Sequence, residues 1–285
     1  MFRPLLQLAA AAGVAGVALF GCAGKPEPPV LRPLAENIST ATAARIDPLL
    51  PAEVLLLGEQ HDAAQHQQIE QQVIALLASR GILAGLALEM ANAGATTASL
   101  KPSSTEQQVK SALKWNDKGW PWQAYSPAVM TAVRAGVPVL GANLPPPLMQ
   151  ASMADGKLDV QLPGPALKAQ QQLIRIGHCN LLPENQITPM TRIQIARDIS
   201  MANTLAQLVL PGKVVVLLSG SGHADRNLGV PQHLPAGISY KSIRLRAGND
   251  APLAGERSDA FDSVWPTPAV PEVDYCEKFK AQMGK

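Results

Sequence analysis

Polar side chains able to do chemistry follow four short apolar runs, at or near the point where each run ends. Glu59 and His61 follow the first run, Glu89 ends the second, Asn143 follows the third, and His223 follows the fourth. Both histidines close a G-x-x-H pattern, in GEQH and in GSGH. Ligands of an open parallel sheet bind outside the carboxyl ends of its strands. If the four runs are parallel strands, two imidazoles, two carboxylates and one amide therefore converge on one rim of the sheet.

This set of side chains could support a metal-dependent reaction. Imidazole and carboxylate ligands together suit zinc, manganese or iron, so His61, His223, Glu59 and Glu89 form a candidate metal site. A metal with an open position could activate water, with one of the glutamates as the general base. The chain has neither an H-E-x-x-H helix nor a G-x-S-x-G elbow. The residues leave three hypotheses open: a metal-dependent peptidase or esterase, a ligand-binding protein, and a scaffold whose glutamates are paired with arginines.

The apolar runs that must position these side chains predict an α/β fold. Each run is short, rich in aliphatic residues and bounded by glycine or proline, which is typical of strands buried on both faces. Apolar residues at helical spacing separate the strands, over residues 63–79 and again over 127–135. The predicted class is a mostly parallel sheet flanked by helices. The runs lie at residues 53–57, 85–88, 137–140 and 213–218.

Two longer stretches break this alternation and predict a helical cap, or insert, over the edge of the sheet. The first covers about residues 100–130 and holds three of the four tryptophans. The second covers about residues 145–210 and is rich in glutamine, with apolar residues at helical spacing towards its end. A further apolar run at 238–245 alternates with basic residues and predicts an edge strand. After Ala247 the chain contains several prolines, and we expect loop.

The N-terminal segment predicts export and lipidation. One cation, Arg3, precedes an uncharged apolar stretch that is long enough for a signal-peptide core but short for a membrane span. The stretch ends in Leu-Phe-Gly-Cys, which resembles the lipobox of bacterial lipoproteins. We therefore expect residues 1–21 to be a signal peptide, and Cys22 to carry acyl chains such as palmitate that anchor the protein stably. A proline-rich spacer is expected over residues 22–40, before one domain over 41–285.

Export to the cell envelope has consequences for location and for the cysteines. Ala23 lacks the aspartate that is linked to inner-membrane retention, which favours a periplasm-facing anchor in the outer membrane. The remaining cysteines are Cys179 and Cys276. Because an exported protein meets an oxidising compartment, we expect a disulfide between them, with free thiols or metal ligation as the open alternatives.

Composition excludes one class of partner. Lysine and arginine number 24 and aspartate and glutamate 22, so the formal charge is nearly balanced. Proteins that bind nucleic acid usually carry a basic face or stripe, and this sequence has none. We therefore expect no nucleic-acid partner.

The two G-x-x-H motifs, with a glutamate ending the strand between them, resemble the TIKI/TraB superfamily and, within it, the ChaN family of haem-binding lipoproteins. The resemblance implies an α/β core with a helical insert, a lipid anchor, and a homodimer with the ligand at its interface. It also implies a part in iron or haem uptake, by binding rather than by catalysis. It covers most of the mature chain, in the segments LLLGEQHD, LALEM, WPWQAYSP, PVLGANLP, RIQIARDISMANTL, LLSGSGHA and DYC.

A haem would need an axial iron ligand and cationic partners for its propionates. Tyr125 fits the W-x-x-Y-x-P pattern of the family and is the first candidate for a phenolate ligand or for a pocket wall; a tyrosine that packs the cap stays open. His61 or His223 could bond a propionate, bond the ligand tyrosine, or bind iron directly. Arg192 and Arg197 could pair with propionates, because arginine matches a carboxylate at two points. The candidate cofactor-binding residues are Tyr125, His61, His223, Arg192, Arg197 and Asn143.

Overall fold

The computed structural model describes residues 40–248 and 259–283. The predicted signal peptide over residues 1–21, the lipidation site Cys22 and all but the last residue of the predicted spacer lie outside the described residues. Within the described ranges, no helix is both long enough and apolar enough to cross a bilayer.

Six parallel strands form one sheet in the described residues, which confirms the predicted α/β class. The strands are β1 (Val54–Glu59), β2 (Leu83–Asn92), β3 (Val139–Asn143), β4 (Val214–Gly220), β5 (Tyr240–Ala247) and β6 (Ser263–Thr267). Their order is β3-β2-β4-β1-β5-β6. The predicted edge strand is therefore wrong in its position, because β5 pairs with β1 on one side and with β6 on the other.

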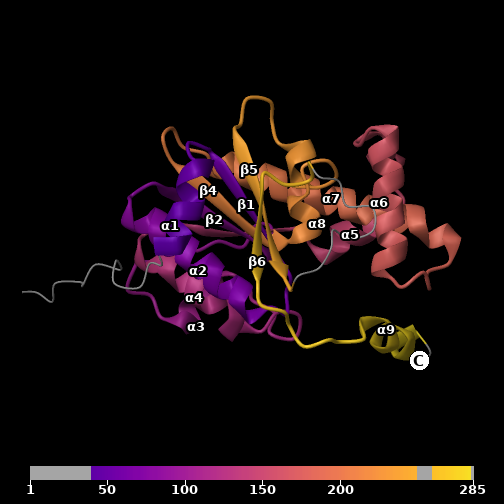
Figure 1. Ribbon diagram of the computed structural model, residues 1–285, viewed down its shortest axis with the longest axis horizontal. Coiled ribbons are helices and arrows are strands. Elements are labelled where there is room, and N and C mark those ends of the chain that lie inside the picture. The colour runs from indigo at the N-terminus through magenta and orange to yellow at the C-terminus, as the bar shows by residue number, and fades with distance from the viewer. Residues whose placement is uncertain (1–39, 249–258, 284–285) are drawn as a thin grey trace, which may run out of the picture. The chain divides into compact units, whose positions relative to one another are not determined.

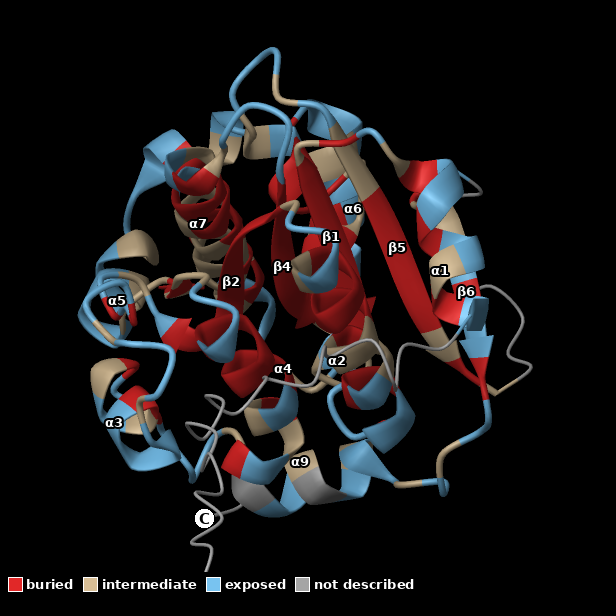
Figure 2. Ribbon diagram, turned by 90° about the vertical axis from the view of Figure 1, so that its left-hand side faces the viewer, coloured by how far each residue is buried: buried red, intermediate tan, exposed pale blue. Residues whose placement is uncertain are grey.

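Two groups of helices cover the two faces of the sheet (Figure 1): α1 (Thr40–Ile46), α2 (Ala64–Ser79) and α4 (Trp122–Arg134) on one, and α7 (Glu184–Leu208) and α8 (Ser221–Ala224) on the other. Leu55 and Leu57 of β1 face the first group, whereas Val54 and Leu56 face the second. Figure 2 shows the central strands as almost wholly buried. Burial on both faces explains why these strands are apolar throughout instead of alternating.

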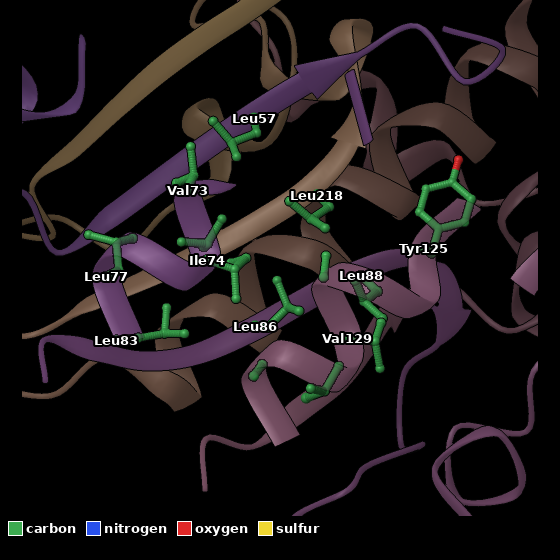
Figure 3. Packing of buried hydrophobic residues seen from close by; sticks show 14 of the residues in the cluster. Leu57, Val73, Ile74, Leu77, Leu83, Leu86, Leu88, Tyr125, Val129 and Leu218 are labelled. Carbon is green, nitrogen blue, oxygen red and sulfur yellow. The ribbon is translucent and has the colours of Figure 1, made fainter. Parts of the chain in front are cut away.

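The helices predicted as a cap over the sheet edge instead belong to both covering layers. Val129 of α4 packs into the same core as Leu86 and Leu88 of β2 (Figure 3). Met201 and Leu205 of α7 pack on the opposite face of the sheet. Within the two stretches, α5 (Pro146–Ser152) and α6 (Gly164–Gly177) pack on α7, and α3 (Glu106–Ala112) precedes α4. Short 3-10 turns complete the described helices: η2 (Asp47–Leu49), η3 (Gly156–Val160) and η4 (Val230–His233).

The chain after Ala247 is more ordered than we predicted. It contributes the edge strand β6 and a final helix, α9 (Tyr275–Met283). A disulfide between Cys179 and Cys276 joins α9 to the residues that follow α6, with the two Cα atoms 5.6 Å apart. The structure thus contains the cysteine pair expected from the predicted export.

Candidate functional site

Strand ends and helix α7 bring the predicted side chains to a single cleft of about 880 Å³. A cleft of this size lies in the range of pockets for small molecules and cofactors. It is lined at the carboxyl ends of β1, β2 and β4, so the expected convergence of both imidazoles on one cavity is present. The predicted residues that line it are Glu59, His61, Glu89, Tyr125, Arg197 and His223.

Glu59, at the end of β1, holds three neighbouring side chains. Its Oε1 atom accepts a hydrogen bond from the hydroxyl of Tyr125 at 2.7 Å and from Nδ1 of His61 at 2.8 Å. Its Oε2 atom accepts a hydrogen bond from the side-chain amide of Gln67 on α2. Glu59 is only 2% exposed, so these donors replace the water that a buried carboxylate loses. The bond to Nδ1 fixes the orientation of the His61 ring and leaves Nε2 as the atom able to accept or coordinate.

His61 is the accessible imidazole of the cleft. Its side chain is 40% exposed, and its ring meets Trp120 edge-on with the centroids 4.8 Å apart. Burial lowers the pKa of His61, but the hydrogen bond to Glu59 and the charge of Glu89 outweigh it, so the pKa is raised. Nε2 of His61 lies 3.9 Å from Glu89 Oε2.

Tyr125 lies deeper in the cleft, on the first turn of α4. Figure 3 shows its ring at the border of the aliphatic core, with the hydroxyl pointing away from the labelled leucines. The residue is 1% exposed. Burial raises the pKa of Tyr125, and the adjacent charge of Glu59 raises it further, so the phenol stays protonated.

Glu89, in β2, lies between the two histidines and joins three elements of the fold. Its Oε1 atom accepts a hydrogen bond from Arg197 at 2.5 Å, and its Oε2 atom accepts one from the backbone N–H of Gly220 at 2.7 Å. His223 Nε2 lies 3.5 Å from Oε1. Burial would raise the pKa of Glu89, but the charges of His223 and Arg197 hold it well below its usual range. Glu89 is therefore a charged, fully partnered carboxylate at neutral pH.

His223 is buried and is part of the same charged network. Its Nδ1 atom donates a hydrogen bond to Asp198 at 2.5 Å. Burial lowers the pKa of His223, but Glu89 and Asp198 outweigh it and raise the pKa to about 9. His223 thus carries a positive charge at neutral pH and serves to hold the two carboxylates.

Two predicted residues play other parts. Asn143, at the end of β3, does not line the cleft; its Oδ1 atom accepts a hydrogen bond from Arg197 Nε at 2.9 Å and so orients that guanidinium. Arg192 does not join the site, because its guanidinium forms a two-point ion pair with Asp159, with bonds of 2.8 and 2.6 Å. Our prediction that Arg192 could reach a propionate is therefore wrong for this structure.

The predicted metal set does not form a metal site. The described residues contain no group of three or more histidine, cysteine, aspartate or glutamate side chains that could hold a metal ion. The physical reason is that the four side chains bind other partners. Glu59 accepts from Tyr125 and Gln67, and Glu89 accepts from Arg197 and a backbone N–H. The metal-dependent hydrolase hypothesis therefore lacks a metal site among the residues described.

Other residues of the cleft were missed by sequence reasoning. Arg244 and Arg246, near the carboxyl end of β5, are part of the lining of the cleft, from the strand that we had predicted to lie at the edge. Their alternate spacing after an apolar run was a usable signal, since i and i+2 share one face of a strand. Trp120 and Tyr275 supply aromatic rings to the cleft. Asp198, the buried partner of His223, does not itself line the cleft, and no sequence pattern singled it out.

The family model and one solved structure name the same family for most of this chain. Residues 46–234, more than half of the chain, match the family described as haem-binding uptake, Tiki superfamily, ChaN. No curated protein sequence matches. Among solved structures, "Cofacial heme binding to ChaN of Campylobacter jejuni" is 26% identical, with a TM-score of 0.63 over 73% of this chain and 87% of that one. A mutant of the erythromycin esterase EreC in its open conformation is 16% identical, with a TM-score of 0.46 over 84% of this chain and 82% of that one.

Proposed function

This chain belongs to the ChaN family of haem-binding uptake proteins in the Tiki superfamily, and we propose that it binds haem in the cleft at the carboxyl ends of β1, β2 and β4. The observation that carries the proposal is the composition of this cleft of about 880 Å³, in which an accessible imidazole, aromatic rings and arginines meet. The Campylobacter jejuni protein is described as binding haem cofacially, which supports the same ligand here.

Arg246, near the end of β5, is a candidate partner for a propionate of the haem. Arg197 is engaged by Glu89 and Asn143, so it is not available as the main partner. Arg246 lines the same cleft from β5, and its side chain is partly exposed. Because an arginine matches a carboxylate at two points, we propose Arg246 as the partner of a propionate.

The geometry favours His61 over Tyr125 as the iron-coordinating residue. Both donate a hydrogen bond to the same oxygen of Glu59. The imidazole of His61 is 40% exposed, whereas Tyr125 is 1% exposed and its raised pKa disfavours the phenolate. A histidine whose other ring nitrogen donates to a carboxylate is the usual form of a metal-binding imidazole. A haem bound here would give the protein a visible absorption spectrum that reports the iron ligand. The residues of the cleft would orient the porphyrin ring and exclude water.

A haemin titration of the protein lacking residues 1–22 tests this function. We expect a saturable Soret band with one haemin per chain in the wild-type protein. His61→Ala should shift the band and weaken binding, because the axial donor is lost. Arg246→Gln should weaken binding without moving the band, because it removes a propionate partner and leaves the iron donor in place. Absence of saturable binding by the wild-type protein would reject the proposal.

We further propose that the protein is an envelope lipoprotein, anchored through Cys22 in the outer membrane and facing the periplasm, where it takes part in haem uptake. The lipobox-like sequence before Cys22 supports this location. Cells fed labelled palmitate should label the wild-type protein but not a Cys22→Ala variant. Equal labelling of both proteins would contradict lipidation at Cys22.

We also propose that two copies associate over the face of α6. Leu173 and Ile176, three residues apart on this helix, are 38% and 47% exposed. The next residue, Gly177, lines the cleft, so a second copy on this face would lie beside the bound ligand. Light scattering should show haemin-dependent dimers in the wild-type protein and monomers in Ile176→Glu. A monomer at saturating haemin would contradict this proposal while leaving haem binding intact.

A further inference from the structure

The described side chains of the C-terminal helix are half-buried or exposed, and a few specific contacts attach this segment to the domain. After β6 the chain runs in extended form to α9, which Figure 1 shows at a distance from the sheet. A helix of nine residues is marginal on its own in water. Asp274 caps it, with its carboxylate accepting a hydrogen bond from the backbone N–H of Glu277 at 2.8 Å. We call residues 274–283 the C-terminal strap.

The contacts that hold the strap attach it to two separate segments beside the cleft. On one side, the disulfide joins Cys276 to Cys179, and the ring of Phe279 meets His178 edge-on with the centroids 5.5 Å apart. On the other side, the hydroxyl of Tyr275 donates a hydrogen bond to Asp62. The strap therefore connects the segment after α6 with the loop after β1.

Each of these two segments contributes a residue to the lining of the cleft. Asp62 follows His61 directly, and Gly177 ends the helix that leads to Cys179; both residues line the cleft. Tyr275 itself lines the cleft and is 53% exposed, although it is the first residue of a helix outside the main core. A large, half-exposed aromatic ring at the mouth of a pocket is a common contact for a flat, apolar ligand.

We infer that the strap is part of the ligand site: Tyr275 contacts the porphyrin ring, and the disulfide between Cys179 and Cys276 keeps it in place. The inference rests on the proposed haem binding and deepens it. Without the disulfide, two of the contacts described above would still hold the strap: the hydrogen bond of Tyr275 to Asp62 and the ring contact of Phe279 with His178. The strap would then have to be ordered each time the ligand binds, and ordering a segment on binding lowers the affinity.

Titration with zinc protoporphyrin IX tests this inference, because its fluorescence reports ring contact independently of iron coordination. Tyr275→Ala and the double variant Cys179→Ser, Cys276→Ser should each raise the dissociation constant about tenfold, while Tyr275→Phe, which keeps the ring, should change it by no more than about twofold. Lys280→Ala, a change on the exposed side chain of the same helix, is the matched control and should bind like the wild type.

Hydrogen exchange supplies a second readout that does not depend on the ligand. In the double cysteine variant, the backbone amides of residues 275–283 should exchange faster, while those of β1 and β4 should be unchanged, because the sheet does not depend on the strap. If the wild type binds the porphyrin and both Tyr275→Ala and the double cysteine variant bind it with the same affinity, the inference is overturned and the haem proposal stands. Absence of any porphyrin or haemin binding by the wild type would reject both.

Discussion

Tyr125 donates the hydrogen of its phenol to Glu59 across 2.7 Å, from a ring that is almost fully buried. Burial, together with the charge of Glu59, raises the pKa of Tyr125 and keeps the phenol protonated, and the hydrogen bond satisfies one acceptor of the buried carboxylate. Tyr125→Phe should therefore keep the Soret band of the haemin complex in place, since His61 remains. Unfolding in urea should show a loss of about 1–3 kcal/mol, the usual cost of removing a partner from a buried charged acceptor. A displaced Soret band in Tyr125→Phe, with an undisturbed one in His61→Ala, would instead make the phenol the iron donor.

Arg197 and Arg192 lie on the same helix and offer a matched pair of substitutions. Arg197→Gln removes a positive charge that pairs with Glu89, a carboxylate that is only 3% exposed. We therefore expect the free energy of unfolding to fall by about 3–5 kcal/mol. Arg192 pairs with Asp159, whose side chain is 36% exposed, and Arg192→Gln should cost about 1 kcal/mol or less. Equal losses in the two variants would show that the Glu89 network does not stabilise the domain.

The charged state of His223 makes stability depend on pH. Its pKa in the folded protein is raised from 6.5 to about 9, so its stabilising contribution is complete below pH 6.5 and is lost as the pH rises through about 9. The full contribution is on the order of 3 kcal/mol. The free energy of unfolding should therefore fall between these pH values in the wild type.

The control for this pH dependence is His223→Gln, which cannot titrate. Above pH 6.5 the free energy of unfolding should fall less steeply with pH in this variant. The fall that remains should come from His61, whose pKa is also raised. If the free energy of unfolding fell equally steeply with pH in the wild type and in His223→Gln, His223 would not be the cause of the pH dependence.

Gly220 allows the His61 ring to lie against the end of β4. A Cβ atom at this position would be 2.9 Å from His61 Nε2, so Gly220→Ala must push the imidazole away. We expect haemin affinity to fall about tenfold or more, with a changed Soret band. Gly222→Ala is the matched control, because a Cβ atom there meets nothing within 4 Å. Similar haemin spectra for both variants would show that His61 does not bind the ligand.

Sequence reasoning placed β1, β2 and β4 because burial on both faces makes their apolar character continuous. It could not give the order of the strands, which depends on pairing between distant segments, and so β5 was assigned to the edge. The edge strand next to β5, β6, was not predicted because it contains Pro266, a residue that disfavours strands but is tolerated at the edge of a sheet.

For the site, the rule on strand ends located Glu59, Glu89 and both cleft histidines, whereas the arginines required structure. Five residues along a helix turn it by about 140°, so Arg192 and Arg197 cannot face the same cavity. Which of them faces the cleft is decided by Asp159, a partner 33 residues away from Arg192 that no local pattern identifies.

The hydrogen bonds of Glu89 also determine when the cleft can be completed during synthesis of the chain. They join residue 89 to partners 108 and 131 positions further along the chain. A chain that is still being synthesised carries the Glu89 carboxylate without either partner. The Glu89 network can therefore form only when β4 joins the sheet, and a polypeptide that ends before β4 would lack the completed cleft.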